Sequence, residues 1–207
     1  MESVSSDQVD LFHNCSRILI GGFSGSGKSY LTAKLINHYQ HKFERIVVIG
    51  SDLGTIQNEK IVRDDNFNIE QFENINNNHW LLVYDDVIHN KTQLRQAMIS
   101  FFMGRHKKIS CIFLTQNIFL NSNDFRTIAL NSTHIILLRM RDNRQITHFS
   151  SSFLPREKRE NFLKLYKLIV LKKKFQYLLI DFLQDPDSSL LIRTNLFDEG
   201  LQTCIQI

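Results

Sequence analysis

Short apolar runs recur along the first two thirds of the chain, separated by segments with helical periodicity. Each run is apolar at successive positions rather than at alternate ones, as in strands of a parallel sheet that are buried on both faces. The runs cover residues 18–21, 45–50, 80–84, 110–115 and 134–138. Apolar residues at helical spacing predict helices over 29–39, 91–103 and 127–130. This alternation predicts an α/β fold of three layers with a mostly parallel central sheet.

The last third of the chain changes character. Pro155 suits the first turn of a helix and begins a charged segment, which predicts a helix over 155–168. Apolar residues at 175–182 and 190–193 flank an Asp-Pro-Asp turn. They predict a C-terminal antiparallel hairpin at the edge of the sheet.

Two other parts of the chain are polar. Residues 51–79 are rich in Asn and Asp, with one short helix expected at 69–73. Residues 1–14 are expected to be a polar lead-in to one domain that covers 15–207, because no change of composition marks a further boundary.

A glycine-rich loop joins the first strand to the first helix. Gly22, Gly27, Lys28 and Ser29 fit the pattern G-x-x-x-x-G-K-[ST] of a phosphate-binding loop. Glycines allow positive φ and let backbone N–H groups converge on phosphate oxygens, while Lys28 would reach the β- and γ-phosphates and Ser29 would bind Mg²⁺. The residues expected to bind the nucleotide, ATP, are Gly22, Phe23, Ser24, Gly25, Ser26, Gly27, Lys28, Ser29 and Tyr30.

The third strand leads directly into two acids, in the run LLVYDD. Phosphate-loop folds hold Mg²⁺ with a carboxylate at such a strand end, so we expect Asp85 to accept a Mg²⁺-bound water. Asp86 could act as the general base that polarises the attacking water. The alternative is a solvated acidic turn.

The fourth strand ends in Thr115-Gln116-Asn117. The amide of Gln116 could hydrogen-bond both the γ-phosphate and the attacking water. Taken by itself, a glutamine at a strand end is more often part of a loop, but after the two earlier motifs Gln116 is a candidate sensor.

Composition limits the setting of the protein. The apolar runs are short and interrupted by charge, so no membrane span is expected, and residues 1–10 are unlike a signal peptide. The three cysteines lack metal or redox spacing and are expected to be reduced and structural, in an intracellular protein. A net charge of +4 and a pI near 9.0 permit a polyanionic partner without requiring one.

The combination of motifs resembles a known family. GFSGSGKS, LLVYDD and GRHKKISCIFLTQN, followed by THIILLRMRDNRQI, YLLIDF and LIRTNLF, resemble the viral DNA-packaging ATPases of the FtsK/HerA superfamily. The likeness runs from residue 17 to residue 197 and is strongest to the poxvirus-type branch, which includes virophages, adintoviruses and Polinton elements. It implies an additional-strand P-loop NTPase fold and a homo-oligomeric ring, usually a hexamer. It also implies ATP-driven translocation of double-stranded DNA into a preformed capsid.

The resemblance assigns roles by position. It places the Walker A pair at Lys28 and Ser29, the Walker B acids at Asp85 and Asp86, and the sensor amide at Gln116. Cellular members carry glutamate where this chain has Asp86, which puts its role as direct base in question. Such a minimal motor implies a capsid or portal-vertex protein as partner, at the site of virion assembly in the host cytoplasm or nucleus.

Arginines and lysines supply further candidates. The resemblance places at Arg105 an arginine that acts on the nucleotide of the neighbouring subunit, and Arg139 and Arg141 are alternatives for that role. Basic clusters that could contact DNA phosphates lie at Lys107 and Lys108, at 172–174, and at Arg156, Lys158 and Arg159.

Two other functions fit part of the sequence. A nucleoside or small-molecule kinase shares the phosphate loop and the size, but it needs an arginine-bearing lid that the chain does not clearly show. A nucleotide-dependent scaffold would not need the intact Lys28, Ser29 and Asp85.

Overall fold

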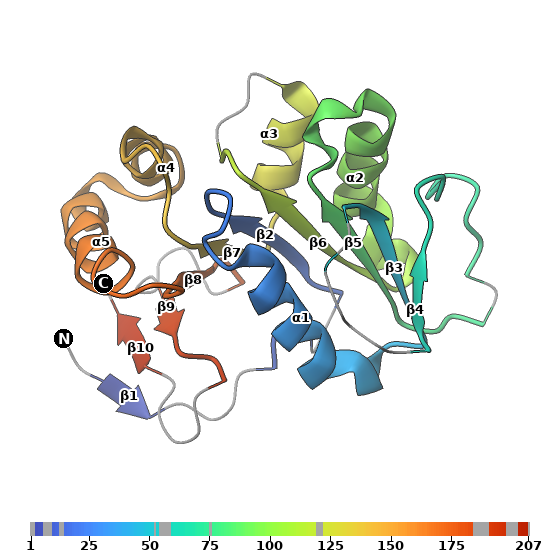
Figure 1. Ribbon diagram of the computed structural model, residues 1–207, viewed down its shortest axis with the longest axis horizontal. Helices are drawn as coiled ribbons and strands as arrows, with labels where there is room; N and C mark the ends of the chain where they lie inside the picture. Colours follow the sequence, from blue (N-terminus) through green and yellow to red (C-terminus); the bar gives the residue numbers. More distant parts are fainter. Residues whose placement is uncertain are drawn as a thin grey trace.

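One mixed sheet organises the molecule. The computed structural model describes residues 3–5, 10–12, 15–51, 53, 59–74, 76–118, 122–183, 191–197 and 203–206. Within these residues the sheet has ten strands in the order β1-β10-β9-β8-β7-β2-β6-β5-β3-β4 (Figure 1). The strands are β1 (Ser3–Ser5), β2 (Arg17–Gly21), β3 (Arg45–Gly50), β4 (Ile61–Arg63), β5 (Trp80–Asp85), β6 (Ile109–Thr115), β7 (His134–Leu137), β8 (Leu178–Asp181), β9 (Leu191–Thr194) and β10 (Thr203–Gln206).

Helices cover both faces of the sheet. The α-helices are α1 (Lys28–Tyr39), α2 (Lys91–Met103), α3 (Asn123–Leu130), α4 (Arg144–Phe153) and α5 (Arg156–Ile169). Short 3₁₀ helices are η1 (Gln40–Lys42), η2 (Val87–His89) and η3 (Gly104–Lys107). Apolar side chains of α1 pack in one core cluster, and those of α2 to α5 pack in the other, so α1 lies on one face of the sheet and α2 to α5 lie on the opposite face (Figure 1).

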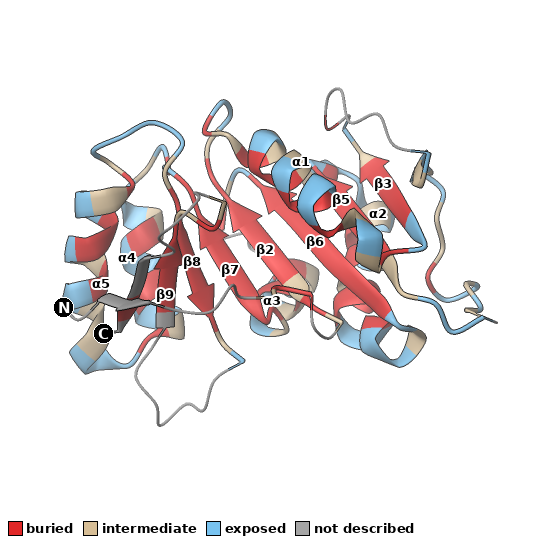
Figure 2. Cartoon of the chain, turned by 90° about the horizontal axis from the view of Figure 1, so that it is seen from below, coloured by how far each residue is buried: buried red, intermediate tan, exposed pale blue. Residues whose placement is uncertain are grey.

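Alternate residues of the central strands enter the two cores. In β2, Ile18 and Ile20 pack on the α1 side while Leu19 packs on the other side. The central strands are therefore buried along their length (Figure 2). This explains why their sequences are apolar at successive positions, and it confirms the predicted three-layer α/β fold.

The sheet changes direction at β7. From β7 through β2, β6, β5 and β3 to β4 the strands are parallel, whereas β8, β9, β10 and β1 continue the sheet with antiparallel pairs. The C-terminal antiparallel hairpin is thus confirmed as β8 and β9. It does not form the edge, because β10 and β1 extend the sheet beyond β9.

Several local predictions were wrong. The segment expected to be a helix at 69–73 begins with a turn, and its Ile69 N–H donates to the side-chain oxygen of Gln96 on α2 at 2.9 Å. The polar stretch around it contains β4, which was not predicted. The helix α4 was also missed, because its serines at 150–152 disfavour a helix, although Ile146 and Phe149 bury its apolar face. The Asp-Pro-Asp turn lies outside the described residues.

The described part of the N-terminal segment is not wholly polar. Leu11 and Phe12 are buried, and the ring of Phe12 meets those of Tyr39 and Phe43 edge to face, each at 5.1 Å between centroids. These contacts attach the segment to the α1 side of the core. The expected boundary between a lead-in at 1–14 and a domain at 15–207 stays a prediction. None of the helices in the described residues has the length and apolar character needed to cross a membrane.

Candidate nucleotide-binding site

The glycine-rich loop lies between the end of β2 and the start of α1, as predicted. Gly27 is the residue before the helix and has φ of +102°, a left-handed conformation that favours glycine. Gly25 has φ of +79°. The Leu31 N–H then donates to the Gly27 carbonyl oxygen at 2.9 Å, which closes the first turn of α1. The loop therefore presents the N-terminus of α1 at the C-terminal edge of the parallel strands, where anions bind.

Lys28 is held by the loop itself. Its Nζ donates to the carbonyl oxygens of Gly22 at 2.7 Å and Phe23 at 3.2 Å, and the residue is 9% exposed. Burial lowers the pKa of Lys28, while Asp85 and Asp86 raise it. The ammonium group thus lies between its own backbone and the acidic end of the site.

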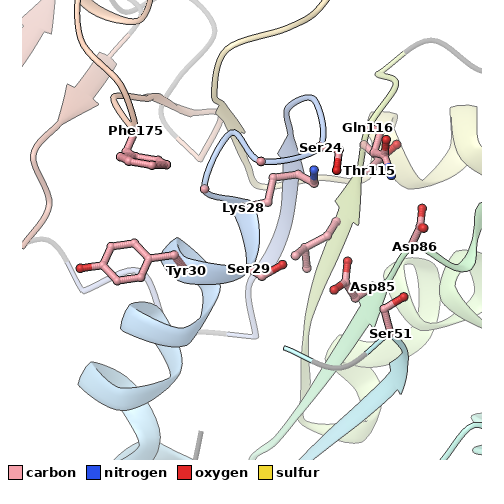
Figure 3. Close-up of a pocket in the computed structure, with 13 residues that line it drawn as sticks. Ser24, Lys28, Ser29, Tyr30, Ser51, Asp85, Asp86, Thr115, Gln116 and Phe175 are labelled. Atoms are coloured by element: carbon pink, nitrogen blue, oxygen red, sulfur yellow. The ribbon is translucent and has the colours of Figure 1, made fainter. Parts of the chain in front are cut away.

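A cavity of about 450 Å³ lies beside the loop, and Figure 3 shows the side chains that line it. The residues predicted for the site that line it are Ser24, Gly25, Gly27, Lys28, Ser29, Tyr30, Asp85, Asp86 and Gln116. Gly22 and Ser26 do not line this cavity, although Gly22 accepts the bond from Lys28. Phe23 lines a neighbouring cavity instead. The fold thus gathers the phosphate loop, the acids and the amide from three adjacent strand ends, those of β2, β6 and β5.

The two acids differ in environment. Asp85 is 7% exposed, and burial raises its pKa to about 6, an effect that Lys28 reduces and Asp86 increases. Asp86 is exposed and has φ of +55°, a left-handed conformation uncommon for a residue other than glycine. One carboxylate is therefore enclosed beside the lysine and the other faces solvent at the strand end.

Gln116 follows β6, which pairs with β2. Gly21 and Thr115 are register partners, and the Gly22 N–H donates to the Thr115 carbonyl oxygen at 3.1 Å. This pairing places Gln116 beside the phosphate loop. Gln116 and Ser24 also line a second cavity of about 650 Å³, whose rim carries the exposed Arg139 and Arg141.

Ser51, Thr115 and Phe175 line the first cavity although they were not predicted as site residues. Ser51 follows β3 as Asp86 follows β5, so its place at the end of a parallel strand was a usable signal. Phe175 gave no such signal. It lies in the loop between α5 and β8. Because β8 runs antiparallel to β7, the start of β8 lies at the end of the sheet where the nucleotide site is.

Arg105 does not lie at this cavity. It is exposed in η3, which precedes β6. Burial lowers the pKa of Arg17, and the nearby charge of Arg105 lowers it further. Arg17 begins β2, and the phosphate loop follows the other end of that strand. Arg105 therefore lies at the N-terminal ends of the parallel strands, whereas the nucleotide site of its own chain lies at their C-terminal ends.

Some basic residues have structural partners. Lys107 donates to the carbonyl oxygens of Ile69 and Phe72 at 2.8 and 2.6 Å. Arg159 donates to those of Leu154 and Ser151, across the junction of α4 and α5. These contacts explain their presence without a nucleic acid.

The structure is similar to those of viral packaging enzymes. The genome packaging NTPase B204 from Sulfolobus turreted icosahedral virus 2, solved with sulfate, is 19% identical in sequence, with a TM-score of 0.60 over 86% of this chain and 96% of that one. The DNA-packaging ATPase B204 from Sulfolobus turreted icosahedral virus is 18% identical, with a TM-score of 0.57 over 83% of this chain and 94% of that one.

A secretion enzyme shares the fold. The cytoplasmic domain of the type VII secretion ATPase EccC from Thermomonospora curvata is 12% identical, with a TM-score of 0.57 over 91% of this chain but 27% of EccC. No family model and no curated protein sequence matches the chain. At these identities the likeness concerns the fold. The chain therefore has the P-loop NTPase fold that its resemblance to packaging ATPases of the FtsK/HerA type implies.

Proposed function

We propose that this protein is an ATP-hydrolysing motor that moves double-stranded DNA, and that it packages a viral or virus-like genome into a preformed capsid. The observation that carries the proposal is the convergence of Lys28, Asp85 and Gln116 on one cavity. A phosphate-binding loop, an enclosed carboxylate and an amide are the parts that hydrolysis of a nucleoside triphosphate requires.

Lys28 is the residue that we expect to change partners when ATP binds. Its Nζ now donates to carbonyl oxygens of the loop, and burial disfavours its charge. Phosphate oxygens at the same place would accept charge-assisted hydrogen bonds, which are stronger than bonds to neutral carbonyl groups. The lysine would then stabilise charge on the β- and γ-phosphates.

Ser29 and Asp85 fit the requirements of a Mg²⁺ site. Among the described residues, no group of three or more His, Cys, Asp or Glu side chains is placed to hold a metal ion. Mg²⁺ beside a nucleotide does not need such a group, because phosphate oxygens and waters supply most of its ligands. The Ser29 hydroxyl and the Asp85 carboxylate line the same cavity and are oxygen donors of the required kind. The bound ion would neutralise charge on the phosphates.

Asp86 and Gln116 are the proposed partners of the attacking water. Both are exposed and both line the cavity on the side away from α1 (Figure 3). We assign Asp86 as the general base and Gln116 as the amide that responds to the γ-phosphate. Gln116 also lines the second cavity, beside Arg139 and Arg141, so it could connect the nucleotide site with a surface that attracts phosphate groups of DNA.

Arg105 supports an assembly in a ring. The strand β2 separates its end of the sheet from the phosphate loop, and five residues in a strand cover about 13 Å. An arginine at that edge is badly placed for the nucleotide of its own chain, but a head-to-tail cyclic interface would bring it to the next subunit. Its planar charged group suits stabilisation of a transferring phosphoryl group.

The similar packaging enzymes give further support. The B204 enzyme of Sulfolobus turreted icosahedral virus 2 has been solved in complex with ATP-γS and with AMPPCP. We propose ATP with Mg²⁺ as the cofactor here, with a capsid or portal-vertex protein as the partner at the site of virion assembly.

The test is ATP hydrolysis by the purified chain, measured with and without double-stranded DNA, alongside its mass in solution. We expect Mg²⁺-dependent hydrolysis, stimulation by DNA irrespective of its sequence, and a mass several times that of one chain. Lys28→Ala is the control and should remain folded but lose hydrolysis. Hydrolysis that DNA does not change, by a monomer, would contradict the motor. Phosphate transfer to a nucleoside instead of water would favour a kinase.

A further inference from the structure

Two exposed aromatic residues lie at one end of the nucleotide cavity. Tyr30 is 63% exposed and Phe175 is 61% exposed, and both line the cavity. They lie on one side of Lys28, whereas Asp85, Asp86 and Gln116 lie on the other (Figure 3). Exposed aromatic residues also occur away from the cavity, as Phe102 does, but Tyr30 and Phe175 lie at its end, where a ligand could cover their rings.

The phosphate loop is shaped to receive the Phe175 ring. A Cβ at Gly27 would lie 2.9 Å from Cδ1 of Phe175, which is too close for a real contact. The absence of a side chain at Gly27 therefore lets the ring lie directly against the loop. Phe175, in the C-terminal third of the chain, is thus brought against the phosphate loop, which begins at residue 22.

The backbone around Phe175 is also unusual. Phe175 has φ of +62°, a left-handed conformation that is an outlier for an aromatic residue and costs conformational energy. Tyr177, two residues later, is buried, and its hydroxyl accepts from the Leu196 N–H at 2.8 Å. The following residues therefore hold Phe175 in a strained position over the loop, and strain of this kind is concentrated at ligand sites.

The polarity of the cavity gives the direction of a bound nucleotide. The acids and the amide define the end where the terminal phosphate reacts, and Lys28 lies between the two ends (Figure 3). The other end of the molecule, the ribose and base, then points toward Tyr30 and Phe175. Aromatic side chains stack on the flat face of a nucleobase, an interaction that the phosphates cannot make.

We propose that Phe175 and Tyr30 form the base-binding edge of the site, with Phe175 stacking on the purine of ATP and Tyr30 closing its other side. The inference rests on the proposed function, because it requires that a nucleotide binds to the phosphate loop with its terminal phosphate at the acids and Gln116. It assigns affinity for the base to Phe175, in the C-terminal third of the chain, together with Tyr30 on α1. Lys34, whose Nζ lies 5.1 Å from the centre of the Tyr30 ring, supports the position of that ring from α1.

The experiment compares a nucleotide with a ligand that has no base. Isothermal titration with Mg²⁺-ADP, Mg²⁺-ATP-γS and Mg²⁺-tripolyphosphate would be done on the full chain, on Phe175→Ala, Phe175→Trp and Tyr30→Ala. Phe102→Ala is the matched control, because Phe102 is 62% exposed but lies on α2 outside the cavity. Phe175→Gly tests the backbone, because glycine adopts the same φ without strain.

We expect Phe175→Ala and Phe175→Gly to weaken both nucleotides about tenfold or more and to leave tripolyphosphate binding unchanged. Tyr30→Ala should have a smaller effect of the same kind, Phe175→Trp should bind nucleotide as tightly as the parent, and Phe102→Ala should bind like the parent. An equal loss for tripolyphosphate would show that Phe175 only shapes the loop and would overturn the proposal. Unchanged nucleotide affinity in Phe175→Ala would overturn it too. A parent chain that binds none of the three ligands would contradict the proposed function itself.

Discussion

Gly50 lies directly against the backbone of Asp85. A Cβ at position 50 would come within 2.1 Å of the Asp85 carbonyl oxygen, and Gly50 has φ of +96°. The next residue, Ser51, donates its N–H to that same oxygen at 3.0 Å. The end of β3 thus fixes the position of the enclosed acid on β5.

Gly50→Ala should therefore destabilise the fold and displace Asp85. A side chain there combines a left-handed backbone with a clash against backbone atoms, which do not move easily, so we expect a loss of about 1–3 kcal/mol in the free energy of unfolding. Denaturant unfolding measures it. Gly25→Ala is the matched control, because Gly25 also has positive φ but a Cβ there meets open space. Equal losses in the two variants would contradict the role of the clash.

Asp85→Asn should make the nucleotide-free protein more stable above about pH 6. Burial raises the pKa of Asp85 from 3.8 to about 6, so the folded chain binds a proton more tightly than the unfolded chain. The stability from that proton is full below pH 3.8 and is lost as the pH rises to about 6, above which the ionised carboxylate destabilises the fold. Asparagine is neutral throughout. Urea unfolding at about pH 5 and pH 8 tests this, and a less stable variant at the higher pH would refute it.

The same substitution should weaken binding of Mg²⁺-ATP. A carboxylate accepts bonds from a Mg²⁺-bound water better than an amide does, and we expect a loss of roughly tenfold or more in affinity. In the parent chain, affinity should fall as the pH drops through about 6 and Asp85 gains a proton. Titration calorimetry across this range, with Asp85→Asn as the variant that lacks the transition, is the measurement.

Asp86→Asn should separate binding from chemistry. If Asp86 is the general base, the variant binds Mg²⁺-ATP normally but hydrolyses it about 10²- to 10⁴-fold more slowly. Single-turnover hydrolysis, alongside nucleotide affinity, measures both quantities. A loss of affinity that matches the loss in Asp85→Asn would show that the two acids share one task.

Gln116→Ala should reduce DNA-stimulated hydrolysis more than basal hydrolysis. Gln116 lines the nucleotide cavity and also the second cavity, which Arg139 and Arg141 line. Its loss would remove the side chain that we propose connects the nucleotide with DNA bound at these arginines. Hydrolysis rates across a DNA titration give the ratio. Asn117→Ala, one residue further from β6, is the neighbouring control. If both rates fall by the same factor, Gln116 has no part in coupling.

Arg105→Ala should abolish hydrolysis and be rescued by mixing. In the proposed ring Arg105 acts on the next subunit, and loss of such an arginine lowers the rate about 10³- to 10⁵-fold. Inactive Arg105→Ala chains mixed with inactive Lys28→Ala chains should regain activity, because some interfaces then carry an intact loop and an intact arginine. No recovery in rings shown to contain both chains would rule out action between subunits.

The predicted site residues that the fold brings to one cavity are those with local signals in the sequence. Lys28 and Asp85 belong to motifs that can be recognised from a strand end and a few residues after it. Because parallel strands place their C-terminal ends together, such a motif is enough to predict where these side chains lie. The helix α2 was predicted with its observed bounds from apolar residues at helical spacing, and the structure adds that the side chain of Asn90 caps its first turn. The α/β class followed from the same signals.

The features that were missed depend on distant parts of the chain. The pairing of β1 with β10 joins residues near the two termini, and neither strand is long or apolar enough to be evident alone. In the sequence, Gly50 resembles any glycine at the end of a strand, and its contact with Asp85 exists only in the folded chain. Phe175 is one of many phenylalanines, and its contact with Gly27 exists only after the chain has folded.

The hydrogen bonds from Lys28 to Gly22 and Phe23 have a kinetic consequence. The ammonium group of Lys28 donates to two carbonyl oxygens of the loop, so these bonds hold the loop in shape before a nucleotide binds. Nucleotide entry would then exchange these bonds of Lys28 for bonds to phosphate oxygens. We therefore expect the nucleotide to associate at close to the diffusion-limited rate. We also expect the enthalpy of nucleotide binding to be smaller than the number of new hydrogen bonds suggests, because the bonds of Lys28 to the loop are lost. When a product leaves, Lys28 would bond to the two carbonyl oxygens again, and the loop would keep the shape that receives the next nucleotide.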